Sequence, residues 1–349
     1  MIRSALAARG LQHLHRRAVA LAVAAPLLLT ACSTGGGGGD STAAPASATT
    51  GPTASASAPP YDASALRKPA GRLFGVASDG AVGDLAPVTA FAAKAGHQPD
   101  VREYYQEWGD DFDPAGNTKL WHNGQVPLLS WVPEQAPLAR IASGGEDAYL
   151  VRFAQQVRSY QGPLVISFAP EMNGGWTAWG PGHATPADFV SAWRHIHDVF
   201  RQQATTNVIW VWTPHVGDSG TPAALRPYYP GDDYLDWVGL IGYYGPQDGS
   251  DYRTLFTPTI RTVRSFSGKP LLIAETGVAE GPRKVAQIDD LFGGAAASDG
   301  LIGLIWYDLR RQWPGSKQPT DWRVDSSAAS AAEVVKQAAQ QKFGFRVAP

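Results

Sequence analysis

Eight short apolar runs, separated by stretches with helical periodicity, constrain the fold of this chain more than any other feature. The runs are rich in β-branched and aromatic residues and are bounded by glycine, proline or polar residues, which is typical of strands buried on both faces. Such an alternation predicts a parallel sheet, and eight repeats predict a closed (β/α)8 TIM barrel. The predicted strands are Leu73–Ala77, Val101–Tyr105, Val126–Trp131, Leu164–Ala169, Val208–Trp212, Val238–Tyr243, Leu271–Ala274 and Ile302–Tyr307.

The stretches between the runs predict the helices of the barrel, because their apolar residues recur with the 3.6-residue period. The predicted barrel covers residues 66–349, which is close to the length of about 250 residues typical of this fold. The sequence contains no internal repeat, so we expect a single catalytic domain. The predicted helices are Asp147–Tyr160, Pro186–Gln203, Thr254–Phe266, Lys284–Phe292 and a final helix, Ser327–Lys342.

The N-terminal segment is predicted to be a targeting signal and not part of the fold. Four arginines precede Ala18–Leu29. This is an apolar run of 12 residues, which is too short to span a bilayer as a helix. The run leads into Leu29-Thr-Ala-Cys32, which resembles the lipidation site of a bacterial lipoprotein signal. We therefore expect residues 1–31 to be a signal peptide and Cys32, the only cysteine, to carry lipid.

Residues 32–65 are rich in Gly, Ser, Thr, Ala and Pro, and such a composition cannot bury enough apolar surface to fold. We expect this segment to be a disordered tether. The mature protein would then be an extracellular domain held by its lipid on the outer face of the bacterial cytoplasmic membrane.

Composition and motifs argue against several classes of function. The formal net charge is −2 and there is no basic block, so we expect no nucleic-acid partner. The eight histidines lack the spacing of metal ligands, and nucleotide fingerprints and a serine nucleophile elbow are absent. We therefore expect no metal, no cofactor and no serine-hydrolase chemistry, and nothing in the sequence argues for more than a monomer.

Two glutamates follow apolar runs and lie far apart in the sequence. Glu171 comes after Leu164–Ala169, and Glu275 comes after Leu271–Ala274. By strand count they end the fourth and seventh strands, which lie across the mouth of an eight-stranded barrel. A structural ion pair is the alternative for either glutamate alone, whereas the two together predict a site that cleaves a glycosidic bond.

The two glutamates are expected to have different protonation states. A retaining glycosidase has carboxyl groups roughly 5 to 5.5 Å apart, one protonated and the other ionised. We expect Glu171 to be the general acid and then the base, with a pKa raised by apolar neighbours and by the second carboxylate. Glu275 is then expected to be the ionised nucleophile.

Aromatic residues recur at or just beyond the ends of the predicted strands. Flat rings at a cleft bind the apolar C–H faces of sugars with little loss of entropy. Core packing is the alternative for any one of them, but six or more at one barrel face indicate a sugar-binding cleft. They are Trp108, Trp131, Trp176, Trp179, Trp212, Tyr243, Tyr244 and Trp306.

Several segments resemble glycoside hydrolase family 26, the β-mannanases and related β-glycanases. Glu171-Met-Asn-Gly, followed by Trp176 and Trp179-Gly, is similar to the acid/base segment of that family. Four later segments agree with the family pattern in the same order along the chain. They are Val208-Ile-Trp-Val-Trp-Thr-Pro214, Tyr228-Tyr-Pro-Gly-Asp-Asp-Tyr-Leu-Asp-Trp-Val-Gly239, Ala274-Glu275-Thr-Gly277 and Asp321-Trp-Arg323.

The resemblance implies a (β/α)8 barrel that retains the anomeric configuration, with Glu171 as acid/base and Glu275 as nucleophile. It implies that Tyr243 hydrogen-bonds and orients the nucleophile, and that Trp306 forms the floor beneath the reacting sugar. We expect the remaining substrate-binding residues to be Trp176, Trp179, Trp131, Trp212, Asn173 and Trp108.

One departure from the family pattern bears on the substrate. Mannanases of the family usually carry histidine immediately before the acid/base, and this chain has Pro170, which can donate no hydrogen bond. We expect an endo-type hydrolase of β-1,4-mannan, with mixed-linkage β-glucan or another β-glycan as the alternative substrate. A glycan-binding lipoprotein without catalysis, and an enzyme that remodels the cell's own surface polysaccharide, are the other readings.

Overall fold

The computed structural model describes residues 61–217, 222–246, 249–312, 317–345 and 347. The predicted signal peptide, Cys32 and residues 32–60 of the predicted tether lie outside the described residues. A 3-10 helix, η1 (Ala63–Arg67), begins before the predicted start of the barrel at residue 66. The backbone N–H of Ala63 donates a 3.2 Å hydrogen bond to the carbonyl of Thr206, so these residues already pack on the barrel. The division of the chain into signal, tether and barrel otherwise stays a prediction.

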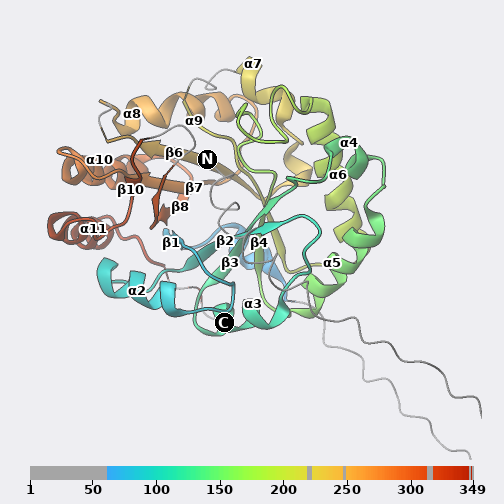
Figure 1. Cartoon of the computed structure of the whole chain (residues 1–349), viewed down its shortest axis with the longest axis horizontal. Coiled ribbons are helices and arrows are strands. Elements are labelled where there is room, and N and C mark those ends of the chain that lie inside the picture. Colours follow the sequence, from blue (N-terminus) through green and yellow to red (C-terminus); the bar gives the residue numbers. More distant parts are fainter. Residues whose placement is uncertain (1–60, 218–221, 247–248, 313–316, 346, 348–349) are drawn as a thin grey trace, which may run out of the picture. The chain divides into compact units, whose positions relative to one another are not determined.

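Eight parallel strands close into a barrel in sequential order, which confirms the predicted fold (Figure 1). Strands β1 and β8 pair over five residues and so complete the ring. Two further short strands, β9 and β10, pair with each other after β8. The strands are β1 (Leu73–Ala77), β2 (Val101–Glu107), β3 (Val126–Val132), β4 (Leu164–Phe168), β5 (Val208–Trp212), β6 (Trp237–Tyr244), β7 (Leu271–Val278), β8 (Leu301–Tyr307), β9 (Arg310–Arg311) and β10 (Thr320–Asp321).

Helices surround the strands, as Figure 1 shows. Their starts follow local sequence signals: Thr185 and Asp188 form a capping box around Pro186 at the start of α6, and Ser327 caps α11. The helices are α2 (Ala86–Ala95), α3 (Pro114–His122), α4 (Leu138–Ala142), α5 (Asp147–Ser159), α6 (Pro186–Gln202), α7 (Pro222–Leu225), η2 (Arg226–Tyr228), η3 (Asp232–Tyr234), α8 (Tyr252–Leu255), α9 (Thr257–Arg264), α10 (Lys284–Ala297) and α11 (Ala328–Gln340).

Three predicted elements differ from the structure. The helix predicted to end at Phe292 continues to Ala297. The helix predicted over Thr254–Phe266 is two helices, α8 and α9, because a proline in the first turn of α9 has no N–H to continue the preceding helix. The strand predicted to end at Ala274 continues to Val278. Residues Leu240 and Ile241 of β6 pair with Ile273 and Glu275, so Ala274 is an extra residue in β7, as in a β-bulge.

Adjacent residues of each strand point alternately into the barrel and out towards the helices. The two tyrosines at the end of β6 show this most directly. The hydroxyl of Tyr243 reaches Glu275, whereas that of Tyr244 donates a 3.0 Å hydrogen bond to Asp290 of α10. This alternation decides which of the predicted aromatic residues can meet a substrate inside the barrel mouth.

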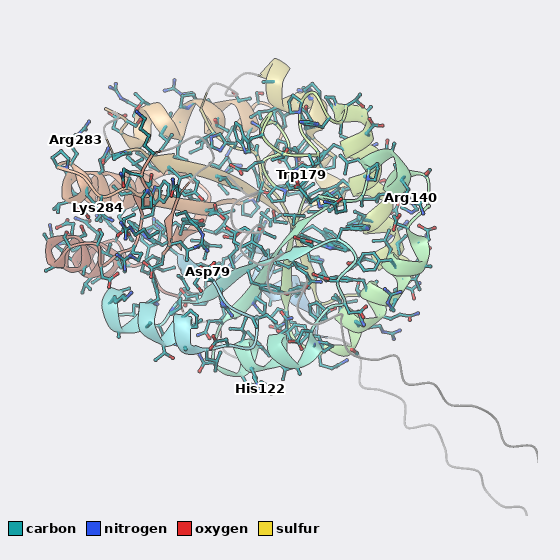
Figure 2. The ribbon with its side chains drawn as sticks, viewed as in Figure 1. Asp79, His122, Arg140, Trp179, Arg283 and Lys284 are labelled. Atoms are coloured by element: carbon teal, nitrogen blue, oxygen red, sulfur yellow. The ribbon has the colours of Figure 1, made fainter. Side chains whose placement is uncertain are left out.

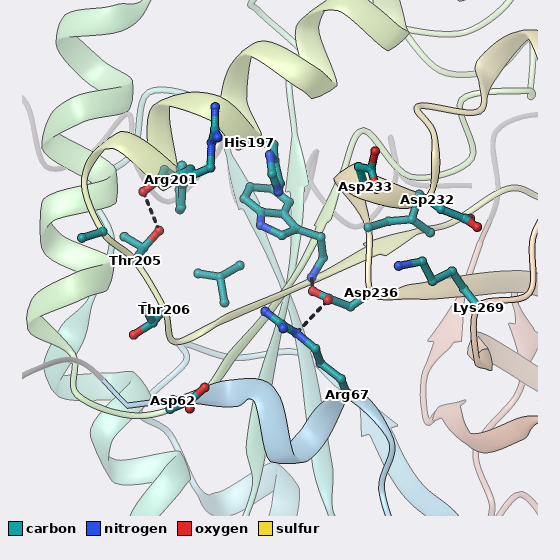
Figure 3. Close-up of a pocket in the computed structure, with 15 residues that line it drawn as sticks. Asp62, Arg67, His197, Arg201, Thr205, Thr206, Asp232, Asp233, Asp236 and Lys269 are labelled. Carbon is teal, nitrogen blue, oxygen red and sulfur yellow. Dashed lines mark hydrogen bonds and ion pairs between the residues drawn. The ribbon is translucent and has the colours of Figure 1, made fainter.

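A pocket of about 590 Å³ lies at the end of the barrel where the strands begin (Figure 3). Its lining includes Val208 at the start of β5, Asp236 just before β6 and Lys269 just before β7. The guanidinium of Arg67 pairs with Asp236 at 2.8 Å across it. Glu171 and Glu275 lie at the other end of the same strands, so this pocket is separate from the predicted site. Among the described residues, no helix has the length and apolar character needed to cross a membrane.

Candidate active site

A sharp turn after β4 orients Glu171. Ala169 and Glu171 both have left-handed backbone conformations, with φ of 47° and 56°, and Pro170 lies between them. Backbone hydrogen bonds hold the turn to both neighbouring strands: Ala169 donates to Trp131 at 2.9 Å, and Glu171 donates to Thr213 at 2.8 Å. Positive φ in residues other than glycine is costly and tends to persist at functional sites, where the surrounding structure enforces it.

The carboxyl group of Glu171 is paired with an imidazole. Nδ1 of His215 lies 2.8 Å from Oε1 of Glu171, and Nε1 of Trp176 donates to Oε2 at 3.4 Å. Asn173 clamps the backbone of His215 through two hydrogen bonds, one from its amide to the carbonyl (2.9 Å) and one from the N–H to its amide oxygen (2.8 Å). The imidazole therefore has a fixed position beside the carboxyl group.

This pairing reverses the expectation for Glu171. Burial alone would raise the pKa of Glu171, but the hydrogen bond and charge of His215 outweigh burial, and the pKa is lowered. The prediction of a raised pKa was wrong because it took no account of a cation at this carboxyl. An imidazole is nevertheless present where Pro170 had suggested that none would be, and it comes from the end of β5.

Glu275 lies inside the barrel mouth directly after the bulge at Ala274 and is 5% exposed. Two phenols donate to its carboxyl group, Tyr105 of β2 to Oε2 and Tyr243 of β6 to Oε1. Burial raises the pKa of Glu275 to about 8, and the hydrogen-bonded carboxyl group of Glu103 offsets only part of that rise. The phenol donors on both oxygens act against burial, because they favour the ionised form of the carboxyl group.

The two predicted glutamates lie close enough to act on the same neighbours. The charge of Glu171 raises the pKa of Tyr243, which is hydrogen-bonded to Glu275, after the larger effects of burial and of Tyr307. Strands four and seven thus bring Glu171 and Glu275 to one site, as the strand count predicted.

Most of the predicted aromatic platform faces away from this site. Trp306 pairs with Thr276, the neighbour of Glu275, so it points to the opposite side of the sheet from Glu275; it is fully buried and donates to the carbonyl of Trp322 at 2.7 Å. Trp131 and Trp212 are also fully buried on the outer side, where Trp131 stacks on Phe153 of α5 at 4.3 Å.

Of the other predicted substrate-binding residues, three pack against or hold other residues, and one is exposed to solvent. Trp108 stacks on the outward ring of Trp131 at 4.5 Å. Trp179, labelled in Figure 2, is 1% exposed and donates to the carbonyl of Pro170 at 2.8 Å, so it supports the Glu171 turn. Asn173 uses its amide to hold His215. Of the predicted tryptophans, Trp176 alone is substantially exposed, at 41%, and its ring meets the His215 imidazole edge-on at 4.9 Å.

Residues to which the sequence analysis gave no binding role complete the inner side of the mouth. Trp322 lies 5.6 Å from the ring of Tyr243 and 5.9 Å from that of Tyr307, and a Cβ on Gly277 would come within 2.9 Å of it. Glycine at that position therefore leaves room for the indole beside the nucleophile. Trp322 and Tyr307 occupy the side of the sheet on which Trp306 was expected.

Three further side chains at this site were also missed: Tyr105, Glu103 and His215. The sequence held a signal for two of them. His215 follows β5 closely, and Tyr105 ends the predicted second strand, so both lie where a barrel builds its site. Glu103 lies in the middle of β2, where nothing in the sequence distinguishes it from a buried strand residue.

Comparisons with known proteins find similar sequences over this part of the chain. The family model described as Glycosyl hydrolase family 26 matches residues 147–284, a range that contains both Glu171 and Glu275. "Endoglucanase H" of Acetivibrio thermocellus is 28% identical over 260 residues, which cover 70% of this chain and 28% of that protein. A mannan endo-1,4-beta-mannosidase of Bifidobacterium adolescentis is 30% identical over 141 residues, 38% of this chain and 14% of that protein.

The fold also resembles solved structures. A GH26 beta-mannanase from Bacteroides ovatus superposes with a TM-score of 0.58 at 18% identity, covering 81% of this chain and 92% of the other. Likeness at this identity concerns the fold. The chain spans less than a third of the length of either curated relative. The chain is thus similar to glycosyl hydrolase family 26 over residues 147–284, and it shares the barrel fold of a solved member of that family.

Proposed function

We propose that this chain is an endo-acting β-glycoside hydrolase that cleaves a β-linked polysaccharide with retention of configuration. The observation that carries the proposal is the contrast between two carboxyl groups at one barrel mouth. Glu275 receives hydrogen bonds from two phenols, and Glu171 is paired with an imidazole and an indole. One group is equipped to remain an anion, and the other to exchange a proton, which is the division of labour that double displacement needs.

In the first step, Glu275 attacks the anomeric carbon as the bond to the leaving oxygen breaks, and the proton goes to that oxygen from Glu171. In the second step, Glu171 takes a proton from water as the water displaces Glu275 from the sugar. Each step returns the carboxyl groups to the state that the other step requires.

The lowered pKa of Glu171 must be offset before this group can act as an acid. In the free protein, the hydrogen bond and charge of His215, whose Nδ1 lies 2.8 Å from the carboxylate, favour the ionised form of Glu171. A bound sugar displaces water, and low polarity favours the neutral form of a carboxyl group. Binding of the sugar should therefore raise the pKa of Glu171 and allow it to protonate the leaving oxygen.

His215→Asn tests this pairing, because it removes the cation and leaves a side chain of similar reach. We expect the pKa of Glu171 to rise, since the group that lowers it is gone, and polysaccharide turnover to fall about tenfold to a hundredfold. Titration of Glu171 by NMR of labelled glutamate, in a Glu275→Gln background, measures the shift. His183→Asn, which changes an exposed histidine in the loop between β4 and α6, is the control. An unchanged titration of Glu171 would remove His215 from the mechanism.

Trp322 is proposed as the platform beneath the reacting sugar, in place of Trp306. We expect Trp322→Leu to lower kcat/KM about 30-fold, because a buried aromatic contact of this kind is worth about 2 kcal/mol. The matched change Trp212→Leu, on the outer side of β5, should instead lower stability by about 3 kcal/mol with kcat/KM within about twofold. Kinetics and denaturant unfolding of both variants separate the two roles, and equal kcat/KM losses would contradict the assignment.

The first-choice substrate is β-1,4-mannan, because the Bifidobacterium relative is a mannan endo-1,4-beta-mannosidase. Mixed-linkage β-glucan is the second, because the other relative is called an endoglucanase and Pro170 departs from the mannanase pattern. Reducing-sugar release by the purified chain on β-mannan, glucomannan, barley β-glucan, β-1,3-xylan and chitin distinguishes these. Binding without release on every polymer would favour a glycan-binding protein, and activity confined to the cell's own glycans would favour surface remodelling.

Lipidation at Cys32 and attachment to the outer face of the membrane remain part of the proposal. They depend on the Leu29-Thr-Ala-Cys32 segment, which lies outside the described residues. The protein is also proposed to be a monomer, because nothing in its sequence argues for a partner subunit.

A further inference from the structure

A third carboxyl group, that of Glu103, lies beside the nucleophile and has no part in the double displacement. Glu103 stands in the middle of β2, two residues before Tyr105, so both side chains point into the barrel on the same face. Glu103 is 2% exposed. Its side chain is hydrogen-bonded to the carboxyl group of Glu275.

The hydrogen bonds of Glu103 show where a proton must be. Oε1 accepts a 2.6 Å hydrogen bond from the hydroxyl of Ser130 on β3. Among the described residues, Oε2 has no donor. The group that Glu103 meets is the carboxyl of Glu275, whose two oxygens already accept hydrogen bonds from Tyr105 and Tyr243. Two carboxylates can make such a contact only if one of them carries a proton.

The number of hydrogen-bond donors available to each carboxyl group indicates that the proton is on Glu103. Glu275 has a phenol on each oxygen, whereas Glu103 has a single hydroxyl on one oxygen. A carboxylate with two or three donors is stabilised as an anion, and a buried carboxylate with one donor is not. In agreement, burial and the charges of Glu275 and Glu171 raise the pKa of Glu103 well above its usual value.

We propose that Glu103 is held as a neutral carboxylic acid whose O–H, at Oε2, donates to Glu275 and thereby stabilises and positions the ionised nucleophile. In this arrangement every carboxyl oxygen of Glu103 and Glu275 has a hydrogen-bond partner. Oε1 of Glu103 is the carbonyl oxygen that accepts from Ser130, and Glu275 accepts from three donors. Glu103 is thus a positioning residue, since it acts on the sugar only through Glu275. This inference rests on the proposed function for its kinetic consequences but not for the protonation state itself.

Glu103→Gln and Glu103→Ala together test the proposal kinetically. Glutamine reproduces a protonated carboxyl group, because its amide oxygen can accept from Ser130 and its amide N–H can donate to Glu275. Alanine removes the donor, so the pKa of Glu275 should rise and the acidic limb of the kcat/KM profile should move to higher pH. We expect Glu103→Ala to lose on the order of tenfold to a hundredfold in kcat, and Glu103→Gln to recover most of that loss.

Infrared difference spectroscopy tests the protonation state without any turnover. The wild-type chain at pH 7 should show the carbonyl stretch of a buried protonated carboxyl group, and Glu103→Gln should lack it. Asp111→Asn, which replaces a carboxylate with a 62% exposed side chain, is the control and should leave the band unchanged.

The outcomes are distinct. An ionised Glu103 would show no such band, and its replacement by Gln would be as damaging as by Ala; either result overturns the proposal. A merely structural Glu103 would lower the melting temperature in both variants without moving the acidic limb. If the band is present but no polymer is hydrolysed, the proposed function fails while the protonation state of Glu103 stands.

Discussion

Glu275→Ala is expected to abolish polysaccharide hydrolysis, with a loss of at least about 10⁴-fold in kcat, the order of loss seen when nucleophiles are removed from other hydrolases. Without the carboxylate no covalent glycosyl intermediate can form, and water would have to attack a poorly activated anomeric carbon. The initial rate of reducing-sugar release on the polymer that the wild-type chain hydrolyses measures the loss.

The protein should still fold after this change, because the partners of Glu275 can form other hydrogen bonds or carry no charge. Tyr105 and Tyr243 can donate to water in the vacated space, and Glu103, as a neutral acid, leaves no unpaired buried charge. Near-wild-type melting temperature and retained binding of the polysaccharide are therefore expected. The outer-face variant Glu333→Ala, in which a carboxylate paired with Lys336 of α11 is lost, controls for a general effect of removing a glutamate. Wild-type-like turnover in Glu275→Ala would end the proposed mechanism.

The barrel could be predicted from the sequence because its signal is local. Each buried strand of a parallel sheet is a continuous apolar run, and eight runs alternating with helical periods leave few other folds. The strands that carry Glu171 and Glu275 could be predicted for the same reason, since position along the chain assigns the two residues to strands four and seven, although Glu275 lies within β7 and not at its end.

The aromatic platform could not be predicted from the same signal, because a strand that is buried on both sides carries no mark of which side faces inward. Trp131, Trp212 and Trp306 are at strand ends, as expected, but alternate with the inward residues and pack against helices instead. Their direction depends on register. In β7, the extra residue at Ala274 changes that register just before Glu275.

The hydrogen-bond partners of the two catalytic candidates could not be predicted, because they lie far from them in the sequence. His215 is 44 residues from Glu171, and Tyr105 is 170 residues from Glu275. Closure of the barrel alone brings these strands to a common mouth. The protonation states depend on these partners, which is why the expected pKa of Glu171 was wrong in direction although its position was right.

Glu171→Ala is expected to distinguish the proposed roles from their reversal. The directions of the pKa shifts, lowered for Glu171 and raised by burial for Glu275, would by themselves suit the opposite assignment. With Glu171 as the acid, its loss should slow polysaccharide hydrolysis by about 10² to 10⁴-fold, because the alcohol that leaves needs a proton. A 2,4-dinitrophenyl β-glycoside has a leaving group that needs none, so its first step should be nearly unaffected.

That substrate makes the second step visible. In Glu171→Ala no base activates water, so the glycosyl group should accumulate on Glu275 and the release of dinitrophenol should show a burst. Azide, which needs no base, should restore turnover and give a β-glycosyl azide, since two inversions return the original configuration. An α-glycosyl azide would indicate single displacement. A β-glycosyl azide formed by Glu275→Ala, and not by Glu171→Ala, would mean that the roles are reversed. Glu275 would then be the acid/base, and Glu171, beside His215, would be the nucleophile.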